Sequence, residues 1–276
     1  MFNIILGFIV LVAGILLLTN RIPLWAAKSY GSTLTRAIGS GALVLGLIFL
    51  GSSSFVFIDA NKVGHLKLIY GFNNLPKGRI IAIDGQKGPQ ADILGPGFHF
   101  IPFVRVLYDV EQQNVVTIPQ GYYGEVTALD GARMPDGMFI APAIEDDKIA
   151  EMLDAATFIK KGGYKGPQET VLKPGSYRIN RYLFRVIDKP SAKTRATIVP
   201  AGHVGVVKSN VMKPGTHCIE EKVTAASEQG RVDGALSVPL VPKGCVGIWR
   251  EPLLPGAYYL NRQAYEVTLV DTRVKT

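Results

Sequence analysis

The stretch Ile118-Pro119-Gln-Gly121-Tyr-Tyr-Gly124 recurs in two further copies along the chain. These copies are Val199-Pro200-Ala-Gly202-His-Val-Gly205 and Val241-Pro242-Lys-Gly244-Cys-Val-Gly247. In each copy, proline fixes φ at the head of a strand, the first glycine permits a tight turn, and the second lets neighbouring backbone approach. Strand-forming residues follow, so the repeat predicts a turn that leads into a short strand and not a phosphate-binding loop, which would need a following helix.

A second motif recurs as a Pro-Gly turn that enters a short strand. Its four copies are Leu94-Gly-Pro96-Gly97-Phe98, Leu172-Lys-Pro174-Gly175-Ser, Met212-Lys-Pro214-Gly215-Thr and Leu254-Pro255-Gly256-Ala-Tyr258. The approach to the motif also recurs, since Lys87-Gly-Pro-Gln90 and Lys165-Gly-Pro-Gln168 each lie four residues before a Leu-x-Pro-Gly sequence. Internal repetition of this kind predicts a modular scaffold.

The hydrophobic residues, 47% of the 276-residue chain, are concentrated in the first 58 positions. The segment from Met1 to Leu18 carries no charge and would form about 27 Å of helix. Ala37 to Ile58 is also uncharged and would form about 33 Å, enough for a bilayer core of about 30 Å. The sequence therefore predicts a membrane anchor in 1–58, with two transmembrane helices at about 2–19 and 37–58.

A cleaved signal peptide is the alternative for the first segment, but it would need basic residues before the apolar run. Here Arg21, Lys28 and Arg36 follow the run, which favours a two-helix hairpin over one span plus a removed or interfacial segment. Gly7 and Gly14 would lie near one helix face, as small residues do where membrane helices pack.

Two spans place the N-terminus and the large domain on the same side of the membrane. By the positive-inside rule, the basic residues of the loops slightly favour an extracytoplasmic position for the large domain. The membrane we expect is a bacterial inner membrane. Two cysteines, Cys218 and Cys245, form neither a disulfide framework nor a metal set, and they leave the side undecided.

From Asp59 onward the chain reads as mainly β structure, an α+β fold with one inserted amphipathic helix at about 146–161. Acidic residues precede the helix, Lys160-Lys161-Gly162-Gly163 ends it, and its apolar residues recur at helical spacing. These apolar residues are Ile149, Met152, Leu153, Ala156 and Ile159. The expected domains are a first β unit at 59–117, a second at 118–190 with the helix, and third and fourth repeat units at 191–276.

The four histidines give no support to a catalytic or metal site. Alignment of the repeats places His203 with Tyr122 and Cys245, and places His99 and His217 where other copies have tyrosine. A metal ligand would not tolerate such exchange, whereas a half-exposed strand position would. Catalytic motifs are also absent from the sequence, so we expect no enzymatic activity, no cofactor and no metal.

Charge is distributed unevenly along the chain. The segment from Lys160 to Lys213 contains twelve basic residues and only two acidic ones, whereas Glu145–Asp154 contains five acidic residues and one lysine. A solvated surface or contact with anionic headgroups would explain the basic segment, and nucleic acid is disfavoured. Our hypothesis is that the acidic helix of one subunit meets the basic unit of the next, closing a ring. The candidate contact residues are Asp146, Asp147, Glu151, Arg178, Arg181 and Arg185.

The hydrophobic anchor, the strand at Val63-Gly64 and the string Leu94-Gly-Pro-Gly-Phe-His-Phe-Ile-Pro-Phe103 together resemble the start of the SPFH or band 7 superfamily, which includes stomatin, prohibitin and flotillin. The later repeats are similar to those of flotillin-like bacterial members and, more distantly, to vault repeats. The resemblance covers about 59–276.

This resemblance implies a non-enzymatic membrane scaffold that assembles as a many-subunit homo-oligomer. Such rings or cages organise lipid microdomains or enclose membrane proteases and other clients. The family's long coiled-coil segment has no counterpart here, and the strand-like run at 270–276 favours a longer protein. The main alternative is a monomeric membrane-tethered adaptor that binds a partner protein through a β edge.

Overall fold

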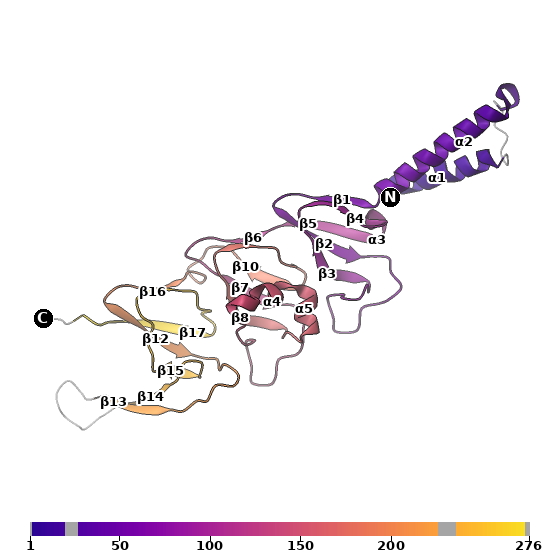
Figure 1. Cartoon of the computed structure of the whole chain (residues 1–276). Helices are drawn as coiled ribbons and strands as arrows, with labels where there is room; N and C mark the ends of the chain where they lie inside the picture. The colour runs from indigo at the N-terminus through magenta and orange to yellow at the C-terminus, as the bar shows by residue number, and fades with distance from the viewer. Residues whose placement is uncertain (1, 20–26, 226–235, 274–276) are drawn as a thin grey trace. The chain divides into compact units, whose positions relative to one another are not determined.

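The chain folds as a mixed α+β protein built mostly from small sheets. The computed structural model describes residues 2–19, 27–225 and 236–273 (Figure 1). These residues form two compact units, Met1–Asn114 and Val115–Thr276.

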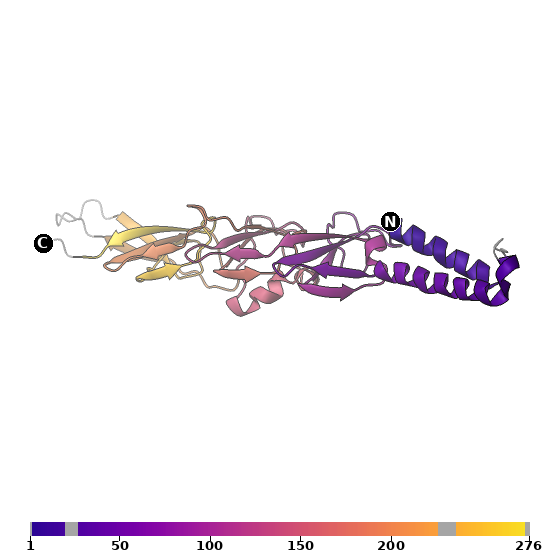
Figure 2. The same cartoon turned by 90° about the horizontal axis from the view of Figure 1, so that it is seen from above.

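Two helices, α1 (Phe2–Leu18) and α2 (Ala27–Ser52), lie side by side in the first unit (Figures 1 and 2). Thr33–Ser52 is long and apolar enough to cross a membrane, and Ile5–Leu18 is a shorter apolar helix. The predicted second span, 37–58, begins within α2 but extends too far, because residues 55–58 form the strand β1. The helix stops at Ser52 because the serines that follow bond to helix carbonyls: Ser53 Oγ donates to Leu50 O at 2.6 Å, and a strand begins at Phe55.

Glycines allow α1 and α2 to approach closely. A Cβ atom at Gly46 would lie 2.8 Å from Leu11 Cβ, and one at Gly14 would lie 2.9 Å from Leu43 N. Gly7 is buried on the same contact, so the predicted packing of Gly7 and Gly14 is confirmed.

Three β-modules follow the helices, and each combines a two-stranded ribbon with a small sheet. The first contains β1 (Phe55–Ile58), β2 (Lys62–Leu68), β3 (Gly88–Leu94), β4 (Gly97–Phe100), α3 (Val104–Leu107) and β5 (Tyr108–Asn114). The second contains β6 (Val116–Ile118), β7 (Gly124–Ala128), β8 (Gly166–Leu172), β9 (Gly175–Tyr177) and β10 (Phe184–Ile187). The third contains β11 (Thr197–Val199), β12 (His203–Ser209), β13 (Glu221–Ala225), β14 (Leu236–Val241), β15 (Gly247–Trp249), β16 (Gly256–Tyr258) and β17 (Tyr265–Asp271).

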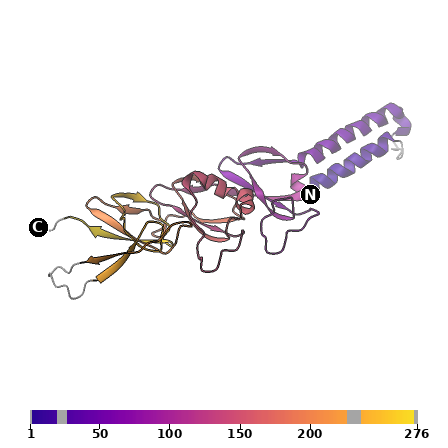
Figure 3. The same cartoon turned by 60° about the horizontal axis from the view of Figure 1, so that its bottom comes forward.

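The strand pairing is the same in all three modules. The strand before the turn pairs antiparallel with the strand after Pro-Gly: β1 with β4, β6 with β9, and β11 with β16. The strand after the turn pairs with the last strand, and the sheet orders are β3-β2-β5, β10-β7-β8 and β13-β14-β15-β12-β17. In the third module, β13 and β14 lie beside each other at one edge of the sheet (Figure 3).

The segment 191–276, where two repeat units were expected, therefore contains one set of these pairs. Pro214-Gly215 forms a turn, and the five residues 216–220 after it belong to no strand, so it does not lead directly into one as the other Pro-Gly turns do. Gly247 adopts φ 127°, a left-handed conformation that neither Gly124 nor Gly205 adopts. The third copy of the first motif is thus a turn inside the third module and starts no further ribbon.

The second glycine of the repeat makes room for a side chain of the preceding strand. A Cβ at Gly124 would lie 2.8 Å from Ile118 Cδ1, and one at Gly205 would lie 3.1 Å from Val199 Cγ2. The first glycine serves the turn, since Gly121 has φ 79°. The sequence assigned both glycines correctly to structure, but the approaching group is an aliphatic side chain rather than backbone.

The inserted helix is interrupted, in contrast to the continuous helix predicted at about 146–161. It consists of the 3-10 turn η1 (Asp146–Lys148) and the helices α4 (Ile149–Leu153) and α5 (Ala155–Lys160). The break lies at Asp154, whose Oδ1 atom accepts a hydrogen bond of 2.8 Å from Thr157 N. A side chain that caps a new helix start favours the break over continuation.

The break changes which residues the inserted helices bury. Ala155 and Phe158 are buried, whereas Ala156, expected in the core, is only half-buried. Phe158 packs edge-to-face on Phe184 of β10 with ring centroids 5.1 Å apart. Gly162 has φ 74° and ends α5 in the left-handed conformation, as predicted.

The helix contact gives a first prediction. Gly46→Val should push α1 away from α2 and lower the melting temperature in detergent, because overpacking costs about 1–3 kcal/mol. Gly41→Val in the same helix is the matched control, since a Cβ there has nothing within 4 Å. Equal melting temperatures for the two variants would contradict the packing.

Candidate functional site

The helices of the first unit expose many of their large apolar residues and bury several small ones. Gly7, Gly14, Gly39, Gly46 and Thr35 are buried between the helices. Large apolar side chains are exposed on both helices: Ile5, Phe8, Ile9, Val12, Ile15, Leu34, Ile38, Val44, Leu45, Leu47 and Ile48. This arrangement is the reverse of a water-soluble helix pair and is typical of helices surrounded by hydrocarbon.

Next to the helices, β1 and β4 carry four phenylalanines on one face, which we call the aromatic ribbon. Phe55 pairs with Phe100 and Phe57 with Phe98 across the two strands. The rings of Phe55 and Phe98 stack with centroids 5.0 Å apart. Phe57, Phe98 and Phe100 are each exposed by 60% or more, so the ribbon presents a continuous apolar surface.

The aromatic ribbon is attached firmly to the end of α2. Ser54 O accepts a 2.9 Å hydrogen bond from Ile101 N, and Ser53 O accepts one of 3.0 Å from Arg105 N. Ser54 Oγ also accepts a 3.0 Å hydrogen bond from Phe103 N. Three hydrogen bonds therefore link the segment directly after β4 to the end of α2.

Phe103 adds a strained backbone at this attachment. With φ 54° and ψ 31°, it is the one non-glycine residue with positive φ among the residues that the structure describes. Its ring is 48% exposed, while the neighbouring Val104 is fully buried. The anchoring of Val104 and the bond to Ser54 hold a conformation that costs about 1–3 kcal/mol.

Three of the six candidate contact residues have partners within the chain. Asp146 is hydrogen-bonded to Lys173 and Glu151 to Lys161. Arg181 lies 3.4 Å from the carboxylate of Asp188. The acidic helix and the basic segment therefore satisfy part of their charge locally, which the uneven charge distribution alone did not indicate.

The other three candidates, Asp147, Arg178 and Arg185, are exposed. None of them takes part in an ion pair with another described residue. Nor does any ion pair in the described chain join an acid of the candidate set to one of its arginines.

The histidines lie at sites of different burial. His99 is half-buried with its Nε2 atom 2.8 Å from Gly95 O, and His217 is exposed. His65, which the repeats did not single out, is buried in β2. Among the described residues there is no group of three His, Cys, Asp or Glu side chains that could hold a metal ion.

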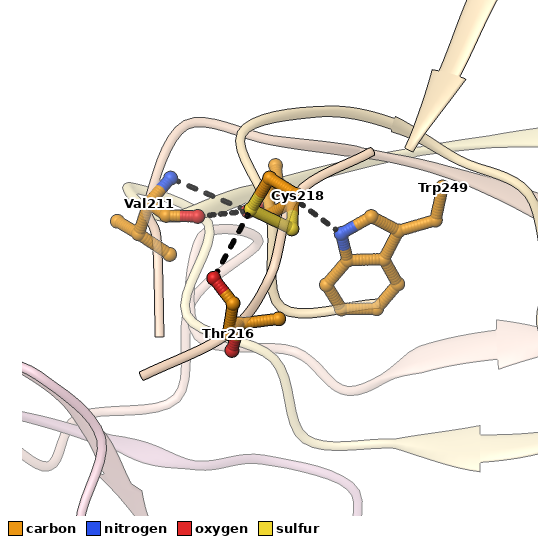
Figure 4. The surroundings of a disulfide bond; sticks show 6 residues. Val211, Thr216, Cys218 and Trp249 are labelled. Carbon is orange, nitrogen blue, oxygen red and sulfur yellow. Dashed lines mark hydrogen bonds between the residues drawn. A yellow bond between two sulfur atoms is a disulfide. The ribbon is translucent and has the colours of Figure 1, made fainter. Parts of the chain in front are cut away.

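Cys245 and Cys218 form a disulfide with a Cα–Cα distance of 5.7 Å (Figure 4). Cys245 is fully buried beside Val207, Val241 and Trp249, so its alignment with half-exposed residues was misleading. The Trp249 indole N–H donates a 3.2 Å hydrogen bond to Cys245 O. The even number of cysteines was the only signal for this disulfide in the sequence. The pairing could not be predicted further, because the fold of the third module is what brings the two cysteines together.

No family model matches the sequence, and no curated protein matches it significantly. The functional inference therefore depends on the apolar helices, the aromatic ribbon and the disulfide.

The disulfide gives a second prediction. Opening a cross-link that spans 27 residues should destabilise the third module by up to about 3.5 kcal/mol, mainly through unfolded-state entropy. Urea unfolding with and without dithiothreitol, followed by tryptophan fluorescence, measures the loss. Cys218→Ser should reproduce it, and dithiothreitol should have no further effect on that variant. If dithiothreitol destabilised the variant as much as the parent protein, its effect on the parent could not be attributed to the disulfide.

Proposed function

We propose that the chain is a non-enzymatic, membrane-anchored scaffold of the SPFH or band 7 type. In this proposal it assembles into a large ring or cage that organises membrane microdomains or holds membrane proteins such as proteases. The observation that carries the proposal is the pair of helices with exposed apolar faces, joined by hydrogen bonds to the segment that follows the aromatic ribbon. Both surfaces would be unfavourable in water and favourable against a bilayer.

The aromatic ribbon suits the boundary between hydrocarbon and headgroups. It begins three residues after α2 ends, so a membrane crossed by α2 would bring the ribbon to this boundary. Aromatic side chains are common at that depth, although Trp and Tyr predominate. The proposed role of the ribbon is to fix the orientation of the first module on the membrane.

The disulfide supports an extracytoplasmic soluble domain. Disulfides persist in oxidising compartments such as the bacterial periplasm and are rare in the cytosol. A buried and tightly packed Cys245 is consistent with a structural bond. Together with the loop charges, this favours a bacterial inner membrane with the modules outside the cytoplasm.

Assembly would use charge that remains exposed after folding. Asp147 on η1 and the two arginines Arg178 and Arg185 are exposed on the second module. A head-to-tail contact between copies would pair them, and such heterologous contacts close into rings when the rotation allows. The proposed contact is thus narrower than the six residues selected from the sequence.

A monomeric adaptor remains the second candidate function, and the edge strand β17 favours it. All seven residues of β17 pair with β12 on one side, and β17 ends the sheet order on the other. Leu269 and Val270 are more than 40% exposed. An extended segment of a partner protein could add to such an edge.

The membrane position of the ribbon gives a third prediction. Phe98→Trp in liposomes should show a blue-shifted emission and quenching by lipids that carry a doxyl group near the headgroup, beyond the signal of the parent protein. Phe139→Trp is the control, because Phe139 is also about half exposed but lies outside the ribbon. Identical quenching of both variants would rule out a specific role for the ribbon.

Assembly gives a fourth prediction. Asp147→Lys should reduce the high-mass species seen by native mass spectrometry in mild detergent, because it reverses one charge of the proposed contact. Adding Arg178→Glu and Arg185→Glu to the Asp147→Lys variant should restore part of the high-mass species, because opposite charges then face each other again. Asp136→Lys is the control, since the Asp136 side chain is 98% exposed and lies outside the candidate set. A single-subunit mass for the parent protein would favour the adaptor instead.

A further inference from the structure

The second unit contains an open cleft of about 630 Å³ between the second and third modules. Its lining includes residues from the segment Pro142 to Lys148, which we call the first wall, and from two loops at 213–214 and 243–244, which we call the second wall. Glu169, Trp249 and Tyr265 form the floor. The volume lies within the range of about 300–1,000 Å³ that is typical of ligand sites. We call this region the lysine cleft.

The floor of the lysine cleft is held by hydrogen bonds and ring contacts. The Tyr265 hydroxyl donates to one carboxylate oxygen of Glu169, and Ala143 N donates to the other at 3.1 Å. Burial, together with the bond to Glu169, raises the pKa of the Tyr265 hydroxyl, so it stays protonated as a donor. Trp249 packs edge-to-face on Tyr265 with centroids 5.3 Å apart. Both Glu169 oxygens are therefore engaged by the protein itself.

The rim carries positive charge that the chain only partly neutralises. Lys148 is paired with Glu145 at 2.6 Å. Lys213 and Lys243 are exposed, and neither forms an ion pair with another described residue. The ammonium of Lys243 lies 5.8 Å from the centre of the Trp249 ring. The pKa of the Glu145 carboxyl is lowered mainly by the bond to Lys148 and, to a smaller extent, by the charge of Lys213. Lys243, and Lys213 to the extent that Glu145 leaves its charge uncompensated, can therefore pair with a ligand.

The disulfide sets the spacing of these two lysines. Lys213 N donates a 2.7 Å hydrogen bond to Gly244 O, which ties one loop directly to the other. Cys218 follows the first loop, and Cys245 follows Gly244 directly. The wall is therefore fixed before any ligand arrives, which reduces the entropy lost on binding.

The lining also has an apolar part, which would stay exposed to water if the cleft bound only a small inorganic anion. Pro142, Ile144 and Pro214 lie on the two walls. A ligand that satisfies both features carries acidic groups for the lysines and apolar groups for the walls. An extended peptide with alternating acidic and apolar side chains meets this description, because successive side chains of an extended chain point to opposite sides.

We propose that the lysine cleft binds an extended acidic peptide segment of a partner protein, with Lys213 and Lys243 pairing to its carboxylates. The site goes beyond the proposed scaffold, since a chain that remained monomeric would still contain it. Each lysine contributes a charge-assisted hydrogen bond, and the apolar walls contribute burial.

The experiment uses the full-length protein in detergent micelles and a fluorescein-labelled eight-residue peptide that alternates glutamate and valine, followed by fluorescence anisotropy. The double variant Lys213→Ser/Lys243→Ser should weaken binding by at least about tenfold. Lys208→Ser is the control for loss of surface charge, since Lys208 is exposed, lies outside the cleft lining and is 3.9 Å from Glu266. Replacing the glutamates of the peptide by glutamine should weaken binding to the parent protein similarly.

Competition and an internal signal complete the test. Unlabelled peptide should compete, whereas equimolar inorganic phosphate or phosphatidylglycerol vesicles should not. Binding should also change tryptophan fluorescence, because a carboxylate that draws Lys243 away alters the surroundings of Trp249. Equal affinity of the double variant and Lys208→Ser would overturn the proposal. Displacement by vesicles would overturn it in favour of a lipid-headgroup site, and displacement by phosphate would show a simple anion site.

Discussion

The close contact between an aliphatic side chain and a glycine of the following strand determines the geometry of each β-module. Ile58 Cδ1 lies 2.6 Å from the position that a Cβ would occupy at Gly64, and the same relation joins Ile118 to Gly124. No other residue lacks the Cβ that would collide there. The contact lets the short strand before the turn pack closely on the strand after it. The same contact recurs in the third module, where Val199 Cγ2 lies 3.1 Å from the Cβ position at Gly205.

Features that depend on local backbone preference could be predicted from the sequence. The turns at Gly121 and Gly202, with φ 79° and 77°, and the glycine packing of the helices came from residue type and spacing alone. Features set by distant contacts could not. The disulfide depends on the fold of the third module. The helix break at Asp154 was missed although its cause is local, since Asp154 Oδ1 accepts a hydrogen bond from Thr157 N.

The sequence repeats correctly indicated where the backbone turns, but they wrongly suggested that aligned residues have equivalent surroundings. Cys245 occupies the position of His203 in the motif, yet one is fully buried in a disulfide and the other is partly exposed. The surrounding strands differ because β13 and β14 are inserted only in the third module. Aligned residues share a backbone turn without sharing an environment, so each candidate site residue has to be assessed from its own contacts.

The strain at Phe103 is best explained together with the proposed membrane position. Most non-glycine residues avoid positive φ, and a strained residue persists where its surroundings hold it. Here the bond to Ser54 and the burial of Val104 supply that constraint, and the result is an exposed ring close to the end of α2. In water the exposed ring brings no compensating gain. At a bilayer interface, transfer of the ring and the aromatic ribbon from water would offset the strain, because fully burying one such side chain contributes about 1.5–3 kcal/mol. The proposed membrane contact would thus offset the cost of holding Phe103 in this conformation.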